Sequence, residues 1–410
     1  MQLTPKTVYS LAMSLVVTGV AINTGLSQAT EEDCGCAPST VETRIAALQS
    51  PALAPAPAPP NTTPPVQAAP AQAPVTPGEN RPRFPAQSTL PRVHDPVLAK
   101  EGDTYYLFAT GRHVSLHTSQ DMKTWTRQGS VFGKPIAWTA TTIPGSNESY
   151  WAPDISFFNG KWHLYYSVST FGRRRSAIGL ATNVTLNPQR ADYAWKDEGV
   201  VVESTQESDY NAIDPNVVLD KNQQPWLSFG SFWGGLKLIQ LDAATGKPKK
   251  EAQLLPIASR PRVRPTNGAI EAPYIIRHGD YYYLFASFDL CCKAVESTYN
   301  IQVGRAKEVT GPYLDREGKP MTEGGGTLVL SSSQRWRGPG HNAVYQDGKT
   351  DWLVYHAYDA EDRGASKLHI EPITWDAEGW PRVPSSSLPA PQPQAQPQPQ
   401  PQPQTQTPAP

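Results

Sequence analysis

Short runs of apolar and aromatic residues, separated by turn residues, dominate the central part of the chain. Five segments share one order: a polar residue, a few apolar residues, a turn, and a strand rich in aromatic residues. Helical periodicity is nearly absent, and the alternating pattern predicts β-hairpins. The segments are HDPVLAKEGDTYYLFATG, APDISFFNGKWHLYYSVS, DPNVVLDKNQQPWLSFGS, EAPYIIRHGDYYYLFASF and HNAVYQDGKTDWLVYHAY.

The polar residues that open these segments are Asp95, Asp154, Asp214, Glu271 and His341. Consecutive ones lie about 60 to 70 positions apart, which suits a blade of four strands. The recurrence predicts an all-β fold, a five-bladed β-propeller, with a β-sandwich as the structural alternative. In a propeller the first strands of all blades converge on one axis, so we expect these five side chains to gather there.

Composition divides the rest of the chain. The chain has 410 residues, and many of its 42 prolines fall in two flanking segments. Residues 30–83 are rich in Ala and Pro, and residues 385–410 repeat Pro-Gln, so both have too few apolar groups to fold and are predicted to be disordered. Residues 84–384 remain for the propeller, which is long enough for a closed all-β domain.

The N-terminal residues predict export. A lysine, Lys6, precedes an apolar stretch from Leu11 to Ile22, and small and polar residues follow. The stretch is shorter than the roughly 20 residues that span a bilayer, so residues 1–29 are predicted to be a cleaved signal peptide rather than an anchor. We expect a secreted or periplasmic monomer without a membrane span in the mature chain.

Charge and cysteine content narrow the classes of function. The formal net charge is −1, no run of basic residues is long enough to bind a polyanion, and Arg173 to Arg175 form only a local cluster, so nucleic acid is not an expected partner. The four cysteines form two close pairs, Cys34 with Cys36 and Cys291 with Cys292, and neither pair has the spacing of a zinc site. Cys291 and Cys292 form either a vicinal disulfide or two packed thiols.

Three of the opening residues are carboxyl groups in similar contexts: Asp95 in HDP, Asp214 in IDP and Glu271 in EAP. A single acid of this kind caps a strand or binds backbone amides in its turn. Converging acids instead push their pKa values apart, so that one stays protonated while another is ionised, as glycosidic hydrolysis requires. Trp151, Phe232 and Trp233 lie beside these motifs, and their rings suit the C–H faces of sugars.

The ordered set RVHDPVLAKEGD, SYWAPDISFFNGKW, YNAIDPNVVLD, SFWGG, AIEAPYII and RWRGPGHNAVYQDG resembles the endo-arabinanases of glycoside hydrolase family 43, over roughly residues 90 to 380. The resemblance implies a five-bladed propeller that hydrolyses α-1,5-linked arabinan or arabino-oligosaccharides, with inversion at the anomeric carbon.

It further implies a role for each matching residue. Asp95 is the expected general base, Glu271 the general acid, and Asp214 the residue that tunes the pKa of the acid. His341 is expected to face a bound metal, taken as one calcium ion in the axial channel. Substrate contacts are assigned to five residues, while Asp154 is expected to have a structural hydrogen-bonding role. The five are Trp151, Asn211, Ser231, Phe232 and Trp233.

Two alternatives stay open. An exo-acting family 43 α-L-arabinofuranosidase or β-xylosidase would use the same acids, although SFWGG and RGPGHN favour the endo-arabinanases. A non-catalytic sugar-binding propeller is the rival from a different class, and three intact acid motifs oppose it.

Overall fold

The computed structural model describes residues 90–264 and 267–383. These residues lie within the predicted propeller segment, 84–384. The predicted signal peptide (1–29), linker (30–83) and tail (385–410) lie outside the described residues, as do Cys34 and Cys36.

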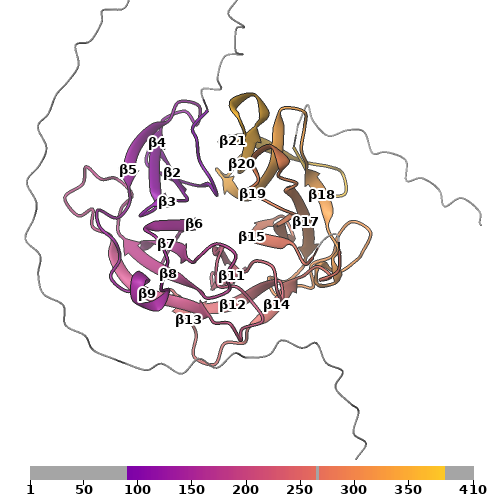
Figure 1. Cartoon of the computed structure of the whole chain (residues 1–410), viewed down its shortest axis with the longest axis horizontal. Helices are drawn as coiled ribbons and strands as arrows, with labels where there is room; N and C mark the ends of the chain where they lie inside the picture. The colour runs from indigo at the N-terminus through magenta and orange to yellow at the C-terminus, as the bar shows by residue number, and fades with distance from the viewer. Residues whose placement is uncertain (1–89, 265–266, 384–410) are drawn as a thin grey trace, which may run out of the picture. The chain divides into compact units, whose positions relative to one another are not determined.

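The described residues form five antiparallel sheets arranged around one axis (Figure 1), which confirms the predicted five-bladed β-propeller. Blade 1 contains β1 (Val97–Glu101), β2 (Thr104–Ala109), β4 (Ser115–Ser119) and β5 (Thr126–Ser130). Blade 2 contains β3 (Gly111–Arg112), β6 (Ser149–Phe158), β7 (Lys161–Val168), β8 (Ser176–Asn183) and β9 (Lys196–Ser204). Blade 3 contains β10 (Asn216–Leu219), β11 (Pro225–Phe229), β12 (Leu236–Asp242), β13 (Lys247–Pro248) and β14 (Leu255–Ala258).

The last two blades have four strands each. Blade 4 contains β15 (Ile270–His278), β16 (Tyr281–Phe288), β17 (Asn300–Ala306) and β18 (Thr327–Leu330). Blade 5 contains β19 (Trp336–Gln346), β20 (Asp351–Asp359), β21 (Ala365–Trp375) and β22 (Pro381–Arg382). Helical structure in the described residues is short: α1 (Thr139–Thr142), η1 (Ala294–Glu296), η2 (Met321–Glu323) and η3 (Ala360–Asp362).

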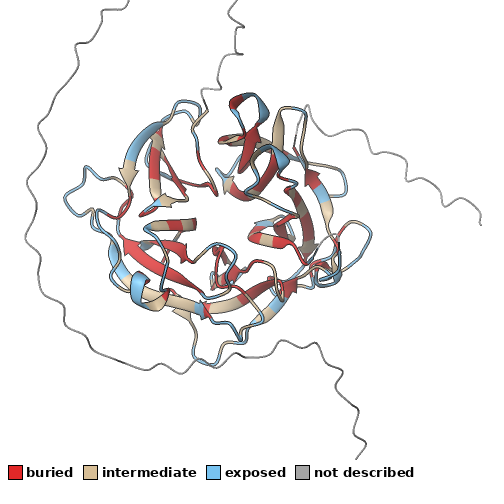
Figure 2. Cartoon of the chain, viewed as in Figure 1, coloured by how far each residue is buried: buried red, intermediate tan, exposed pale blue. Residues whose placement is uncertain are grey.

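The predicted hairpins are confirmed. Glu101 pairs with Thr104, Phe158 with Lys161, and His278 with Tyr281, so two residues connect each of these strand pairs. The aromatic strand of each segment pairs with the strand that opens the segment. It is largely buried in every blade (Figure 2), and its buried aromatic residues belong to the hydrophobic clusters of the core. Examples are Phe108, Tyr166, Phe229, Phe285 and Tyr355.

A ring of five residues with left-handed backbone conformation lies where the chain enters the blades. Their φ angles are between 44° and 58°, and four of the five precede a proline. A non-glycine residue pays a conformational cost in this region, and such residues concentrate at functional sites. The five are Asp95, Ala152, Asp214, Ala272 and His341.

The backbone N–H groups of this ring connect neighbouring blades. The N–H of Ala152 donates to Thr110 Oγ1 (2.8 Å), and that of Asp214 donates to Ser167 Oγ (3.0 Å). His341 N–H donates to Ser287 Oγ (2.8 Å). The three acceptors occupy equivalent positions in their blades: each follows by two residues the aromatic residue that pairs with the second residue after the left-handed one. The entry point of each blade is therefore fixed by its neighbour.

Each blade is built from strands of its own stretch of chain, except that the short β3, which follows β2, pairs with blade 2. The seam between blade 5 and blade 1 is therefore closed by contacts rather than by a shared sheet. Leu368 N–H donates to the carbonyl of Pro91 (2.9 Å), and the guanidinium of Arg92 pairs with Asp362 (2.9 Å). Asp95 N–H donates to Nδ1 of His356 (3.2 Å), so the seam reaches the ring of left-handed residues.

Candidate active site

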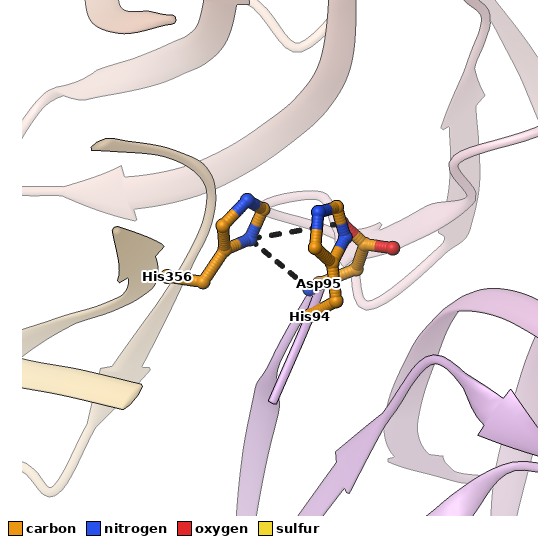
Figure 3. A group of neighbouring side chains, drawn as sticks. All are labelled: His94, Asp95 and His356. Atoms are coloured by element: carbon orange, nitrogen blue, oxygen red, sulfur yellow. Dashed lines mark hydrogen bonds and ion pairs between the residues drawn. The ribbon is translucent and has the colours of Figure 1, made fainter. Parts of the chain in front are cut away.

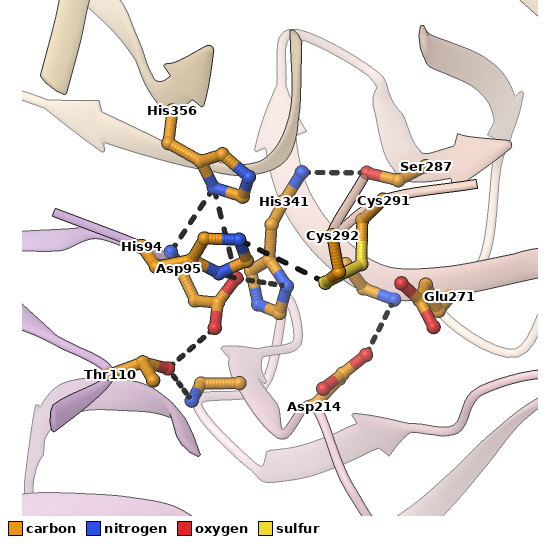
Figure 4. Close-up of polar contacts among 12 residues, drawn as sticks. His94, Asp95, Thr110, Asp214, Glu271, Ser287, Cys291, Cys292, His341 and His356 are labelled. Atoms are coloured by element: carbon orange, nitrogen blue, oxygen red, sulfur yellow. Dashed lines mark hydrogen bonds and ion pairs between the residues drawn. A yellow bond between two sulfur atoms is a disulfide. The ribbon is translucent and has the colours of Figure 1, made fainter. Parts of the chain in front are cut away.

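The structure brings Asp95, Asp214, Glu271 and His341 together near the axis, as predicted (Figure 4). Their positions within the repeat differ from the predicted equivalence. Asp95, Asp214 and His341 belong to the left-handed ring, whereas Glu271 immediately precedes its ring residue and Asp154 follows its own by two residues. Side-chain type alone therefore misaligned two of the five segments, because backbone conformation defines the true register.

Asp95 is buried, and several donors surround its carboxylate. Oδ1 lies 2.7 Å from His94 Nδ1 and 3.1 Å from His341 Nδ1, while Thr110 donates its hydroxyl to Oδ2. Burial raises the pKa of Asp95, but the opposing influence of His341 and His94 is larger and holds the pKa well below its ordinary value. Asp95 is therefore ionised at neutral pH, which is the state a general base requires.

The histidine next to Asp95 is held on both sides. His94 Nε2 lies 2.8 Å from the hydroxyl of Tyr358, and its ring packs against that of His356 with centroids 3.8 Å apart (Figure 3). Burial is the largest single influence and lowers the pKa of His94, but the charge and hydrogen bond of Asp95 together with the charge of Glu271 outweigh it and raise the pKa. His94 therefore fixes the orientation of the Asp95 carboxylate.

Glu271 is at the start of β15, in blade 4. Ser231 donates its hydroxyl to Oε2 (2.7 Å), and Tyr299 donates its hydroxyl to Oε1. Both carboxyl oxygens are thus held in place, one from the loop after β11 and one from the residue before β17. Glu271 is less buried than Asp95 and Asp214, which leaves it accessible to a substrate.

Asp214, in blade 3, is the third acid. Its Oδ2 accepts the N–H of Ala272 (3.1 Å), the residue next to Glu271. Burial, followed by the negative charges of Glu271 and Asp95, raises the pKa of Asp214 well above its ordinary value. One acid of the cluster is thus kept ionised and another is pushed towards the protonated form, the separation expected for acid and base chemistry at one site.

Asp154 is apart from this chemistry. It is 1% exposed, and its Oδ2 accepts the N–H of Val217 (2.9 Å), while its Oδ1 is 3.4 Å from Nδ2 of Asn216. Burial raises the pKa of Asp154 to about 6, although these hydrogen bonds oppose the rise. The side chain of Asp154 connects blade 2 to blade 3, in keeping with the structural role that the sequence suggested.

The predicted aromatic residues are close in the chain to residues of the site. Trp151 pairs with Ser167 beside the ring residue Ala152 and is partly exposed. Phe232 and Trp233 follow Ser231, also partly exposed, with ring centroids 6.4 Å apart. The guanidinium of Arg174 lies 5.6 Å from the Trp233 ring. Part of each ring is therefore available for contact with a ligand.

Asn211 and Ser231, the two polar residues assigned to substrate contact, are each 3% exposed. Oδ1 of Asn211 accepts the hydroxyl of Ser176 (2.6 Å), so Asn211 is part of a buried network. Ser231 contacts Glu271. The geometry gives both residues supporting contacts, and direct substrate binding by them stays a prediction.

The residues near His341 offer a limited set of metal ligands. His94, Asp95 and His356 have potential ligand atoms within 4.8 Å of one another, yet only Asp95 contributes oxygen, whereas calcium prefers six to eight oxygen ligands. Next to His341, Asn342 is 2% exposed and neither atom of its amide has a protein partner; His356 Nε2 also has none. Buried polar groups of this kind are normally satisfied by water or an ion. The protein groups fit a cation only if water supplies most of its ligands.

Several residues at the site carried no recognisable sequence signal. Thr110 directly follows β2 and Ser287 is the last but one residue of β16, while Tyr299 and Tyr358 are in or near strands far from any acid motif. Of the unpredicted residues around the acids, His94 alone belongs to a short acid motif that the sequence singled out, HDP. Contacts that join different blades depend on the closed ring, so no single segment could reveal them.

A five-bladed propeller whose axis is lined by one acid with a lowered pKa, one with a raised pKa and a third, accessible acid is consistent with a glycoside hydrolase. The model of glycosyl hydrolases family 43 matches residues 90–381. The chain belongs to this family.

Characterised relatives share nearly half of the matched residues. An extracellular exo-α-(1→5)-L-arabinofuranosidase of Cellvibrio japonicus is 47% identical, covering 72% of this chain and 87% of the relative. An extracellular endo-α-(1→5)-L-arabinanase of Bacillus subtilis is also 47% identical, covering 70% and 87%. The structure of a Cellvibrio cellulosa α-L-arabinanase complexed with arabinohexaose is 45% identical with a TM-score of 0.69, covering 72% and 96%.

Proposed function

We propose that the protein hydrolyses internal α-1,5-L-arabinofuranosidic linkages of arabinan with inversion of anomeric configuration. The observation that carries the proposal is the contrast between Asp95, held ionised in blade 1, and Glu271, accessible in blade 4. The similarity to arabinan-degrading relatives, at 47% identity, supports this substrate class.

Each carboxyl group has one role in the proposed reaction. Glu271 gives its proton to the glycosidic oxygen as the bond to the anomeric carbon breaks. Asp95 removes a proton from the water that attacks that carbon from the opposite side. Because the displacement is single, the product has inverted configuration. Asp214, bonded to the N–H next to Glu271, adjusts the pKa of the acid and helps to orient the sugar.

Proton NMR of freshly formed product tests this mechanism. An inverting enzyme releases the β-anomer first from α-linked arabinan, before mutarotation mixes the anomers. If the α-anomer forms first, Asp95 is not a base and a nucleophile must be sought among the acids.

Exo-action is the second candidate, because the relatives at 47% identity include both an exo-acting and an endo-acting protein. The motifs SFWGG and RGPGHN favour internal cutting. The test is a time course of product lengths on linear arabinan. Internal cutting gives a spread of long oligosaccharides early, while exo-action gives one short product from the start.

Trp151, Phe232 and Trp233 form the proposed sugar platform. All three residues are partly exposed, and the C–H surfaces of arabinosyl units can stack on their rings. Asn211, which accepts a hydrogen bond from Ser176, and Ser231, which donates one to Glu271, are the proposed polar contacts of the substrate.

One calcium ion is proposed near the axis, with His341 as its protein contact and water supplying the other ligands. The unpaired amide of Asn342 beside His341 supports a hydrated cation there. When bound, the ion would supply positive charge near the acids. Chelation should reduce activity and calcium should restore it, and His341→Ala should be impaired without response to calcium. Full activity of the chelated enzyme would rule the ion out.

Export is proposed for the mature protein, which would act outside the cytoplasm. Two relatives are named extracellular, and the N-terminal residues have the pattern of a signal peptide. In the described part of the chain, no helix is long and apolar enough to cross a membrane. N-terminal sequencing of protein from the culture medium would locate the cleavage site.

A further inference from the structure

Cys291 and Cys292 form a disulfide between adjacent residues, one of the two states that the sequence left open. The pair is in the loop of residues 289–299, which connects β16 to β17. Glu271 pairs with Ser287 near the end of β16, so this loop leaves the sheet beside the proposed general acid. The proposed roles of the acids do not involve the disulfide.

The disulfide also reaches the side of the site that holds the proposed base. Cys292 N–H donates to the hydroxyl of Tyr358 (2.9 Å), the same hydroxyl that lies 2.8 Å from His94 Nε2. Cys292 Sγ is 4.0 Å from His94 Nε2, and His94 contacts Asp95. Figure 4 shows the two sulfur atoms among the side chains of His94, His341 and Glu271.

The loop that carries the pair is fixed in position. Thr298 N–H donates to the carbonyl of Leu290 (2.9 Å), and Lys293 N–H donates to Ser297 Oγ (3.0 Å). A Cβ on Gly364, in the corresponding loop of blade 5, would lie 2.5 Å from Cβ of Ala294, so the two loops are tightly packed. A ligand would therefore meet the sulfur atoms in a preformed position.

Part of the surface of this loop is apolar, although Lys293, Glu296 and Thr298 are exposed as well. Cys292 is exposed and Cys291 is partly exposed, and Leu290 and Val295 are 37% and 40% exposed. Disulfide sulfur is polarisable and a weak hydrogen-bond acceptor. It therefore makes favourable dispersion contacts with C–H groups and cannot satisfy hydroxyl groups, so it would favour the less hydroxylated face of a sugar ring.

We propose that the Cys291–Cys292 disulfide is a wall of the substrate cleft that packs against the C–H surface of an arabinosyl unit next to the scissile bond. This inference rests on the proposed function, since it assigns a specificity-determining contact to the same site. The disulfide binds and orients the sugar and takes no part in proton transfer.

A stabilising cross-link is the competing role. The restraint that a disulfide places on the unfolded chain grows with the length of the loop it closes, and adjacent cysteines close almost none. Loss of this bond should therefore change stability little. A role in substrate contact predicts instead that binding is lost while the fold is kept.

The test is the double substitution Cys291→Ser/Cys292→Ser, with Cys34→Ser/Cys36→Ser as the matched control. On linear arabino-oligosaccharides we expect kcat/KM to fall about tenfold in the first variant, the size expected when a contact of one or two methylene groups is lost. Most of the change should be in KM, and the melting temperature should stay near that of the unmodified protein. The control variant should match the unmodified protein in kcat, KM and melting temperature.

Reduction of the unmodified protein gives a second measurement that does not depend on folding of the variant. A mild reductant should raise KM as thiols are released, reoxidation should restore KM, and the Cys291→Ser/Cys292→Ser variant should not respond. An unchanged KM in the folded variant and in the reduced protein would overturn the proposal. A loss confined to kcat would overturn it too, because the disulfide would then only position His94 and Asp95. An unmodified protein without activity on arabinan would instead contradict the proposed function.

Discussion

At the scale of single residues, the site separates its carboxyl groups by their surroundings. Asp95 is surrounded by His94, His341 and Thr110, and Asp214 is buried with two other acids as its charged neighbours. The pKa of Asp95 is thereby lowered and that of Asp214 raised, although both are aspartates. The sequence predicted which acids would meet, but the groups that set their pKa values belong to other blades and could not be identified from the motifs.

The two proposed catalytic roles can be distinguished by the leaving group. On arabinan the departing group is a sugar hydroxyl, so Glu271→Ala and Asp95→Ala should each lose about 10² to 10⁴ in rate. On an aryl arabinoside the phenol leaves without much protonation, so Glu271→Ala should recover a large part of its rate and Asp95→Ala should not. The measurement is the ratio of rates on the two substrates for each variant. Recovery by Asp95→Ala instead would exchange the two roles.

Asp214 should act through the pKa of Glu271. The charges of Asp214 and Glu271 oppose one another, so Asp214, whose pKa is raised, ionises only towards alkaline pH, where its charge favours the protonated form of Glu271. Asp214→Asn removes that charge. The alkaline limb of the kcat/KM profile, which reports loss of the proton from the general acid, should therefore move to lower pH in Asp214→Asn. An unmoved limb with a uniformly lower rate would show that Asp214 acts only by holding the N–H of Ala272.

At the scale of elements, the hairpins and the period were predictable because each is local. Two-residue turns such as Asn159-Gly160 connect the strand pairs of blades 1, 2 and 4, and turns of four or five residues connect those of blades 3 and 5. The alignment between blades was not predictable from acid positions. Glu271 and Asp154 occupy different register positions because the left-handed residue, not the acid, is what the repeat preserves.

Asp154 joins two elements, and its contribution should depend on pH. Its pKa in the folded protein is about 6, above the ordinary value of 3.8. Between these values the folded protein keeps a proton that the unfolded chain has lost, so the free energy of unfolding should fall as pH rises through this window, by up to about 3 kcal/mol. Urea unfolding at pH 4 and pH 7 should show this loss in the unmodified protein and a smaller one in Asp154→Asn. Equal pH dependence in both proteins would contradict it.

At the scale of the whole molecule, closure of the ring determines whether the site exists. Glu271 comes from blade 4, Asp214 from blade 3 and Asp95 from blade 1, so no single blade contains the proposed reaction centre. The sequence predicted this convergence from the repeat, since radial symmetry brings equivalent positions to one axis. What it could not indicate is how the ends of the ring meet.

The seam between blades 1 and 5 has a consequence for the order in which the protein matures. The contacts of Arg92 with Asp362, His94 with Tyr358, and Asp95 with His356 join residues 261 to 270 positions apart in the chain. Contacts of such separation carry a large loop-closure entropy and form late, after the local hairpins. Synthesis proceeds from the N-terminus, so Asp95 is made early. Its neighbours His341 and His356 belong to blade 5, which is made last. A nascent chain would therefore become competent for hydrolysis only when nearly the whole domain has been translated.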